Sequence, residues 1–286
     1  MKVNFAYLDS GTGGLPYLKY LKNKMPDASC VYVGDTKNFP YGEKSKTEII
    51  EKSSECVKKI IEKCFPDVIV VACNTISVSA LDELRRRFPE IPFVGTVPAI
   101  KPAAKITKTK RIGLLATNAT VNHPYTKRLI CDFAGDCEVF SLGAPELINF
   151  IEHKYYFADY KERVNAAKPC CDYFKQNGCD VIVLACTHFL NMAEEIKDAA
   201  GAEIEVVDSR EGVTRHALEI FAEVKKNVSE NIEKAENLEL AKSAENSESV
   251  GKSTSALYIT GFSEKNDEKR YLAFCEQNNI KFGGLL

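Results

Sequence analysis

A nine-residue segment occurs twice in the chain, and this repeat is the feature that most constrains the fold. Residues 67–75 read DVIVVACNT and residues 180–188 read DVIVLACTH, so only one of the first seven positions differs between the copies. Each copy is a short apolar run rich in β-branched residues, which is typical of a strand that is buried on both faces. The repeat therefore predicts two equivalent strands, each followed by a cysteine, and it favours two domains over one large one.

Similar apolar runs recur along the chain between longer amphipathic stretches. We expect strands at residues 4–8, 30–33, 68–72, 93–95, 112–116, 138–140, 181–185 and 204–207. Alternation of strands with helices predicts right-handed βαβ units and therefore parallel sheets with helices on their faces. The sequence thus indicates the α/β class.

Local signals place several helix ends and one unusual segment. Ser45 and Glu48 form a capping-box pattern, and Pro16 stands where the first turn of another helix is expected. From residue 223 to 255 the chain is rich in Lys, Glu, Asn, Ser and Ala, which indicates either a solvated helical extension or a flexible insertion. A strand at 256–261 and a helix at 267–276 should then return the chain to a folded domain.

Composition excludes several classes of function. The formal net charge is −2 and no basic cluster is present, so we expect no nucleic-acid partner. No run of about 18 apolar residues occurs, so we expect no membrane span. Eleven cysteines, without a signal-peptide pattern in residues 1–8 or zinc-site spacing, indicate a reducing, cytoplasmic environment and no metal.

The repeated cysteines, Cys73 and Cys186, are the first candidates for chemistry. Each should lie at the carboxyl end of a strand beside a helix N-terminus, which lowers the pKa of a thiol from about 8.5 toward neutrality. An inert core cysteine is the usual alternative for such a position. The duplication, together with the polar neighbours Asn74–Thr75 and Thr187–His188, favours a chemical role.

Other polar groups follow the expected strands. The glycine turn at residues 9–14, DSGTGG, matches neither a dinucleotide motif nor a P-loop, so a small anion is its expected ligand, with a tight turn capped by Asp9 as the alternative. The loop at 34–42 should form a lid or contact surface at the same edge, or an ordinary surface loop. His188 could relay a proton for Cys186, and Asp9 could serve Cys73. The remaining histidines have no comparable context.

Four segments, at residues 9–15, 34–42, 72–75 and 185–188, resemble the signatures of the cofactor-independent aspartate/glutamate racemase family, in the family's order. The resemblance covers residues 3–209, and 258–261 is similar to the family's closing strand. It implies two pseudo-symmetric domains, each a mostly parallel sheet flanked by helices, with the active site in the cleft between them. The expected domains are 1–96 plus 209–286, with a charged insertion at about 223–255, and 97–208.

The resemblance also implies the reaction and its residues. It implies racemisation of glutamate without a cofactor, supplying D-glutamate for bacterial peptidoglycan, with Cys73 acting on D-glutamate and Cys186 on L-glutamate. Asp9 and His188 would support these thiols, and Glu152 would be a further acid near the site. Substrate contacts are expected from Asp9, Ser10, Tyr41, Gly42, Asn74, Thr75, Thr117, Thr120, Thr187 and His188. A homodimer is common in this family.

The chain departs from the family pattern at Phe189–Leu190, His123 and His153–Lys154, and these positions bear on substrate preference and closure of the cleft. An aspartate racemase, a decarboxylase of similar fold that needs a single thiol, and a non-catalytic amino-acid-binding module are the alternatives. A thiol redox protein is another, although Cys73 has no resolving cysteine close in sequence.

Overall fold

Two parallel sheets form the framework of the chain. The computed structural model describes residues 1–237, 255–262 and 267–286. The first sheet has the strand order β10-β9-β2-β1-β3-β4 and the second has the order β6-β5-β7-β8, and all the pairings in both are parallel. The strands are β1 (Val3–Asp9), β2 (Cys30–Gly34), β3 (Pro66–Val71), β4 (Phe93–Gly95), β5 (Arg111–Ala116), β6 (Glu138–Gly143), β7 (Val181–Leu184), β8 (Glu205–Val207), β9 (Ser255–Ile259) and β10 (Lys281–Leu285).

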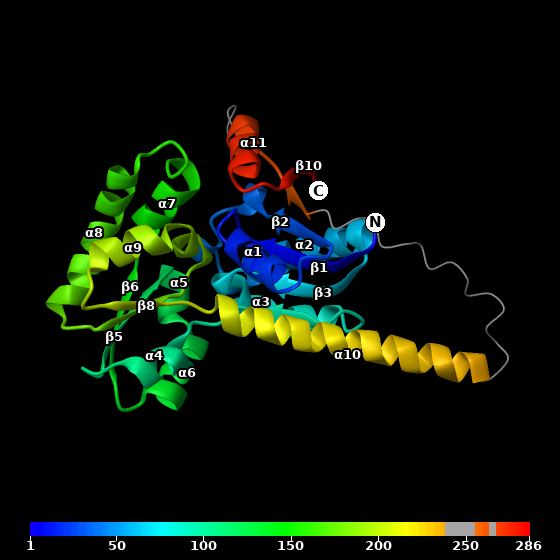
Figure 1. Ribbon diagram of the computed structural model, residues 1–286, viewed down its shortest axis with the longest axis horizontal. Helices are drawn as coiled ribbons and strands as arrows, with labels where there is room; N and C mark the ends of the chain where they lie inside the picture. Colours follow the sequence, from blue (N-terminus) through cyan, green and yellow to red (C-terminus); the bar gives the residue numbers. More distant parts are fainter. Residues whose placement is uncertain (238–254, 263–266) are drawn as a thin grey trace.

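Helices surround each sheet, so the molecule consists of two bodies side by side (Figure 1). Around the first sheet lie α1 (Leu15–Lys24), α2 (Lys46–Cys64), α3 (Asn74–Arg87) and α11 (Asp267–Gln277), with the 3-10 turns η1 (Thr36–Asn38) and η2 (Tyr41–Glu43). The second body contains α4 (Ile100–Ile106), α5 (Asn118–Asn122), α6 (Pro124–Ala134), α7 (Pro145–His153), α8 (Tyr160–Gln176), η3 (Thr187–Met192) and α9 (Ala193–Ala200). The long helix α10 (Arg210–Asn237) starts between the bodies and runs along the first (Figure 1).

The α/β class and the two-sheet arrangement predicted from the sequence are confirmed. The predicted capping box of α2 is present, and Pro16 lies in the first turn of α1. The charged segment continues α10 as a helix to Asn237, and residues 238–254 lie outside the described residues. Strands of the first sheet come from residues 3–95 and 255–285 and those of the second from 111–207, although the exact domain boundaries stay a prediction.

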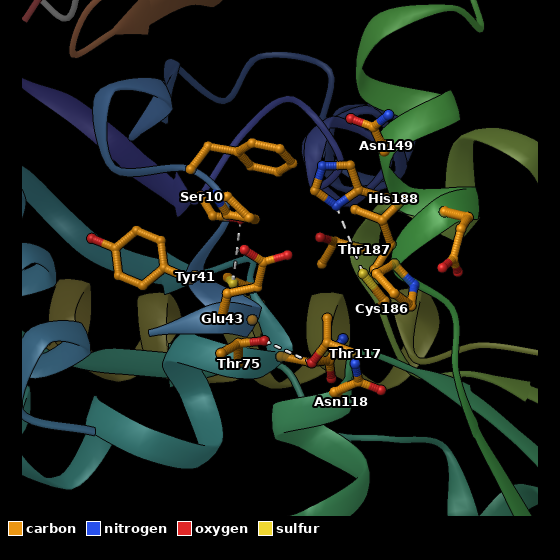
Figure 2. Close-up of a pocket in the computed structure, with 18 of the residues that line it drawn as sticks. Ser10, Tyr41, Glu43, Thr75, Thr117, Asn118, Asn149, Cys186, Thr187 and His188 are labelled. Carbon is orange, nitrogen blue, oxygen red and sulfur yellow. Dashed lines mark hydrogen bonds between the residues drawn. The ribbon is translucent and has the colours of Figure 1, made fainter. Parts of the chain in front are cut away.

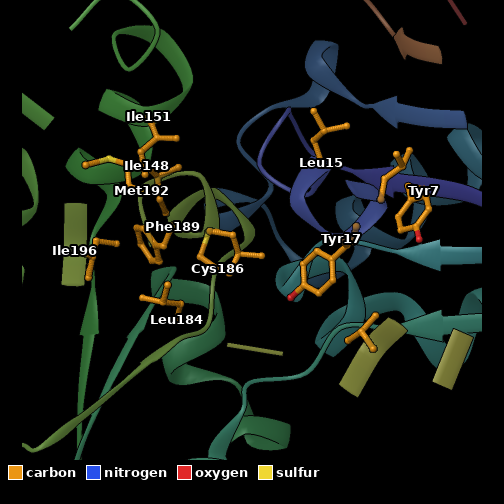
Figure 3. Close-up of a cluster of buried hydrophobic side chains, with 14 of the residues drawn as sticks. Tyr7, Leu15, Tyr17, Ile148, Ile151, Leu184, Cys186, Phe189, Met192 and Ile196 are labelled. Atoms are coloured by element: carbon orange, nitrogen blue, oxygen red, sulfur yellow. The ribbon is translucent and has the colours of Figure 1, made fainter. Parts of the chain in front are cut away.

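Apolar side chains fill the space between strands and helices in both bodies. All seven residues of β1 are buried, as are all four of β7, which agrees with strands covered on both faces. Figure 3 shows Leu184, Phe189 and Ile196 packed in the second body, with Tyr7 and Tyr17 in the first. In the part of the chain that the structure describes, no helix combines the length and apolar character needed to cross a membrane.

The topology also decides where the two repeated segments end. β3 lies beside β1 in the first sheet, and β7 lies beside β5 in the second. Parallel strands end at the same edge of a sheet, so the loops that follow these strands gather at one edge of each body. The two edges face each other across the gap between the bodies, and the residues that follow β1, β3, β5 and β7 meet there.

Candidate functional site

A cavity of about 540 Å³ lies between the two bodies, and both repeated cysteines line it (Figure 2). Cys73 comes from the first body and Cys186 from the second, and their exposed fractions are 4% and 5%. Most of the other residues expected at the site also reach the cavity. Its lining includes Ser10, Tyr41, Gly42, Asn74, Thr75, Thr117, Thr187 and His188.

Three of the expected residues lie behind this lining rather than in it. Asp9, Thr120 and Glu152 are all buried, at 0%, 0% and 3% exposure. Thr120 donates nothing to the cavity; its backbone N–H and hydroxyl bind the Thr117 hydroxyl at 3.1 and 3.0 Å. Its role in the structure is therefore to hold Thr117, which in turn lies 3.1 Å from the Thr75 hydroxyl across the gap between the bodies.

Cys73 stands between the end of β3 and the first turn of α3, as the repeat predicts. Its sulfur lies 3.9 Å from the Ser10 hydroxyl. Burial raises the pKa of the Cys73 thiol well above its usual range, and the nearby charge of Asp9 raises it further, while the backbone N–H of Ile76 lowers it by less. The expected fall of the pKa toward neutrality is thus wrong for Cys73, because the effect of burial outweighs that of the helix N-terminus.

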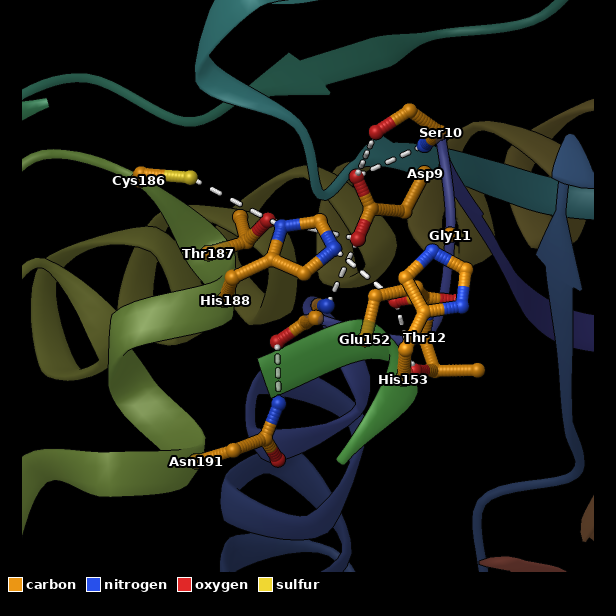
Figure 4. A network of polar contacts seen from close by, with 12 residues as sticks. Asp9, Ser10, Gly11, Thr12, Glu152, His153, Cys186, Thr187, His188 and Asn191 are labelled. Carbon is orange, nitrogen blue, oxygen red and sulfur yellow. Dashed lines mark hydrogen bonds and ion pairs between the residues drawn. The ribbon is translucent and has the colours of Figure 1, made fainter. Parts of the chain in front are cut away.

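Cys186 has a different setting from its counterpart. It stands at the N-terminus of the 3-10 helix η3, so the helix that follows this thiol is a 3-10 helix, whereas an α-helix follows Cys73. Its sulfur lies 3.7 Å from Nδ1 of His188, and Nε2 of the same ring lies 3.0 Å from Oε2 of Glu152 (Figure 4). Carboxyl, imidazole and sulfur therefore form one continuous polar chain in the second body.

The electrostatics of this chain favour its charged form. Burial alone would raise the pKa of Glu152, but the hydrogen bond from His188 and the charges of His188 and Arg270 lower it to about 2. Burial opposes a charge on His188 as well, yet its contacts with Cys186 and Glu152 raise the pKa of the imidazole well above its usual range. Both shifts thus favour an ionised Glu152 paired with a protonated His188.

Asp9 organises the glycine turn that follows β1. One carboxylate oxygen accepts from the backbone N–H of Ser10 at 2.7 Å, and the other accepts from the N–H of Gly14 at 2.7 Å, from the Tyr32 hydroxyl at 3.0 Å and from the Thr187 hydroxyl at 3.2 Å. Burial raises the pKa of Asp9, and the charge of His188 together with the hydrogen bonds from Ser10, Tyr32 and Gly14 offsets only part of that rise.

This arrangement corrects the expectation of an anion held by the glycine turn. Among the described residues no hydrogen bond joins Asp9 to Cys73, so their interaction is one of charge. Three amides of the turn are already bound by the chain's own carboxylates: those of Ser10 and Gly14 donate to Asp9, and that of Thr12 donates to Glu152. The capped tight turn, the alternative interpretation, describes the geometry better than an open anion cradle does.

Two polar groups of the lining face the cavity in different ways. The Oδ1 atom of Asn74 is buried without a hydrogen-bond partner among the described residues, so it is available to a ligand's donor. The Tyr41 hydroxyl instead donates to Asp35 at 2.5 Å and points away from the cavity (Figure 2). Tyr41 therefore offers its ring and backbone to the cavity rather than its hydroxyl.

Part of the lining was not predicted from the sequence. It consists of Glu43, Asn118, Pro145, Glu146, Ile148, Asn149 and His153, whereas Phe39 and Pro40 belong to the loop at 34–42 that was expected at this edge. Three polar members, Glu146, Asn149 and His153, are spaced by three and four residues, which places them on one face of α7. That spacing is the one signal that sequence reasoning had available, and it left His153 without a role.

Comparisons with known proteins agree with this geometry. The pattern that describes the Asp/Glu/hydantoin racemase family matches residues 17–217. A protein of Treponema pallidum named glutamate racemase is 36% identical, covering 99% of this chain and 96% of its own length. One of Glaesserella parasuis, of the same name, is 38% identical over 93% of this chain and 97% of its own.

Solved structures show the same likeness. The glutamate racemase of Escherichia coli, in complex with L-glutamate and the activator UDP-MurNAc-Ala, superposes with a TM-score of 0.81 at 29% identity, covering 99% of this chain and 97% of its own. The glutamate racemase of Aquifex pyrophilus superposes with a TM-score of 0.65 at 28% identity, covering 100% of this chain and 98% of its own.

Proposed function

Since the chain belongs to the Asp/Glu/hydantoin racemase family, we propose that it is a glutamate racemase that interconverts L- and D-glutamate by direct proton transfer at the α-carbon. One observation carries the proposal: two buried thiols, Cys73 and Cys186, come from equivalent strands of two bodies and line a single cavity. Racemisation needs one group to remove the α-proton and another to deliver a proton to the opposite face. A single pair of facing thiols meets both needs.

In the proposed mechanism the substrate lies between the thiols. Cys186 removes the α-proton of L-glutamate and Cys73 protonates the resulting carbanion from the other side; with D-glutamate the roles reverse. The hydrogen-bonding groups of Ser10, Asn74 and Thr187 bind the substrate and stabilise the charge that develops on its carboxylate in a site closed to water. No cofactor takes part in this scheme.

The remaining site residues act through these groups. His188 holds a proton next to Cys186, and Glu152 keeps that imidazole charged and oriented. Asp9 fixes the turn that presents Ser10 and binds Thr187 of the other body. The ring of Tyr41, the backbone of Tyr41 and Gly42, and the hydroxyls of Thr75 and Thr117 complete the substrate contacts, and Thr120 supports Thr117.

The wider role follows from the reaction. We propose that the product D-glutamate supplies bacterial peptidoglycan, that the enzyme works in the cytoplasm, and that it forms a homodimer. Sedimentation of the purified protein tests the last of these. Sedimentation as a monomer at working concentrations would reject the dimer and leave the reaction untouched.

Exchange in deuterated water tests the reaction itself. Each enantiomer of glutamate is incubated with the purified enzyme without added cofactor, and racemisation is followed by chiral chromatography while NMR follows the α-hydrogen. We expect both enantiomers to racemise and the product enantiomer to carry deuterium at the α-carbon, because the proton-donating thiol exchanges with solvent. Racemisation without α-deuterium would reject the two-thiol mechanism. Aspartate, which is one methylene shorter, serves as the comparison substrate.

Replacement of each thiol tests its role. Cys73→Ala and Cys186→Ala should each lower kcat by about 10²-fold or more, because each removes one of the two proton-transfer groups. The exposed Cys131 gives a matched control, and Cys131→Ala should racemise glutamate at the wild-type rate. Full activity in Cys73→Ala or Cys186→Ala would exclude that thiol from the reaction. Tight glutamate binding by the wild-type protein without turnover would instead favour a binding module.

A further inference from the structure

The C-terminal helix α11 connects the two bodies at the edge of the cavity. It leads from β9 to β10, both in the first sheet, yet it contacts the segment that follows α7 in the second body. Arg270 Nη1 donates to His153 Nδ1 at 2.6 Å. Four residues further on, the Phe274 ring meets the Tyr156 ring edge-on at 5.2 Å. One face of α11 therefore bridges the bodies.

Arg270 is firmly held in this bridge. Its side chain is 10% exposed, and Nη2 donates to the Tyr271 hydroxyl at 2.7 Å and pairs with Asp267 at 3.2 Å. A guanidinium can only donate hydrogen bonds, so Nδ1 of His153 is the acceptor, and a neutral His153 ring carries its proton on Nε2. The contact thus fixes both the position and the tautomer of a residue that lines the cavity.

The bridge ends directly at the polar chain that contains Cys186. His153 follows Glu152 at the end of α7, and Glu152 is the partner of His188. The Phe39 ring, from the loop of the first body, lies 6.3 Å from the His153 ring and 5.6 Å from the His188 ring. Arg270 also helps to keep Glu152 ionised, since its charge contributes to the low pKa of that carboxyl.

We propose that Arg270 is a positioning residue for the Cys186 half of the site: by binding His153 it holds the end of α7 where Glu152 meets His188. Cys73 does not depend on this contact, because it stands between β3 and α3 beside Ser10 in the first body. The inference rests on the proposed function, since it assumes that both thiols transfer protons. It predicts that damage at Arg270 slows one of the two proton transfers.

A comparison of kcat/KM between L- and D-glutamate cannot show that only one of the two proton transfers has slowed. Racemisation has an equilibrium constant of one, so kcat/KM must remain equal for the two enantiomers in any variant. Primary isotope effects measured with α-deuterated L- and D-glutamate do distinguish the steps. Cys186 removes the α-proton of L-glutamate, so a slower Cys186 step makes cleavage of the α-bond more rate-limiting for that enantiomer. With D-glutamate, Cys186 reprotonates the carbanion, so reprotonation becomes rate-limiting instead.

The test compares three variants of the full-length enzyme. Arg270→Met removes the donors and keeps the length of the side chain, Arg270→Lys keeps a charge and a donor, and Lys269→Met changes the exposed neighbour on α11. We expect Arg270→Met to lower kcat by about 10- to 100-fold, to raise the isotope effect with L-glutamate and to reduce it with D-glutamate. Arg270→Lys should recover part of both changes, and Lys269→Met should match the wild type.

The outcomes separate this inference from the proposed function. Isotope effects that change equally for both enantiomers in Arg270→Met, or that stay at wild-type values, would overturn the inference while racemisation stands. A wild-type enzyme without turnover or α-exchange would overturn the proposed function itself. If Arg270→Met does not fold, His153→Leu removes the acceptor from the other side and should give the same one-sided pattern; a symmetric pattern there overturns the inference as well.

Discussion

The two buried carboxyls of the site are tuned in opposite directions by their immediate partners. Asp9 accepts hydrogen bonds only from amides and hydroxyls, and burial raises its pKa in spite of these bonds and of the nearby charge of His188. Glu152 faces the imidazole of His188 with the charge of Arg270 nearby, and its pKa falls to about 2. The two thiols thus occupy similar positions at the ends of equivalent strands, but the buried carboxyl groups near them are in different electrostatic environments.

Replacing Glu152 tests this difference at a single residue. The folded pKa of about 2 lies below the ordinary 4.5, so the ionised carboxylate adds stability above pH 4.5, and that stability is lost as the pH falls toward 2. The raised pKa of His188 works in the other direction: its contribution is lost as the pH rises through that raised value. At pH 7, Glu152→Gln leaves a buried charge unpaired and should reduce the free energy of unfolding by roughly 3–5 kcal/mol.

Urea denaturation followed by circular dichroism measures that loss. The difference between wild type and Glu152→Gln should narrow between pH 4.5 and 2, because the wild-type carboxyl becomes protonated there. The exposed Glu43 at the cavity provides the control, and Glu43→Gln should change stability by less than about 0.5 kcal/mol. A loss of equal size at pH 3 and pH 7 would contradict the assignment of an ionised Glu152.

At the scale of elements, the strands that carry the thiols could be predicted because they are uniformly apolar and end in polar residues. β10 could not be, since Gly283 and Gly284 give it little strand propensity. The structure supplies the reason for one of these glycines: a Cβ at Gly283 would lie 2.6 Å from the Tyr258 ring. That requirement comes from a neighbouring strand and leaves no local pattern.

The same limit explains the missed part of the cavity. Asp9 and the residues after the cysteines follow strands and could be placed at a sheet edge from the sequence alone. His153 and Asn149 reach the cavity because α7 of the second body packs beside the first body, and no periodicity of the sequence records that packing. Polar residues on one face of α7 indicate that this face contacts either solvent or a functional site, and the sequence pattern does not distinguish between the two.

The glycine turn of the first body packs closely against η3 of the second body. A Cβ added at Gly13 would lie 2.6 Å from the backbone nitrogen of His188, and backbone atoms cannot move aside cheaply. Gly13→Ala should therefore push η3 away from the turn, reduce the free energy of unfolding by roughly 1–3 kcal/mol and lower kcat. Thermal unfolding and the racemisation assay measure the two effects.

Gly212 in α10 is the matched control for this substitution, because a Cβ there meets nothing within 4 Å. Gly212→Ala should leave activity unchanged and raise stability by up to about 1 kcal/mol, since alanine favours a helix over glycine. Wild-type activity in Gly13→Ala would show that the turn and η3 are free to separate without harm to the site.

For the whole molecule, a few polar contacts hold the two bodies around the cavity. Asp9 binds Thr187, the Thr75 hydroxyl meets that of Thr117, Thr12 donates to Glu152, and Arg270 donates to His153. A hydrogen bond between neutral groups is worth about 0.5–1.5 kcal/mol, and the contact between the Phe274 and Tyr156 rings adds to the association of the two bodies. A substrate that touches both sides would add to these contacts and stabilise the closed arrangement.

That expectation can be measured through unfolding. A ligand at 100 times its Kd adds about 2.7 kcal/mol to the unfolding free energy of the structure that binds it. Racemic glutamate is the suitable ligand because turnover does not change its composition, and far-ultraviolet circular dichroism is the suitable signal because the chain has no tryptophan. If both bodies form the site, glutamate should raise the unfolding free energy of the whole protein by this amount in a single transition. Glycine at equal concentration is the control and should leave the unfolding free energy unchanged. If the protein unfolds in two transitions and glutamate shifts only one of them, a single body binds the ligand. That result would contradict a site shared by Cys73 and Cys186.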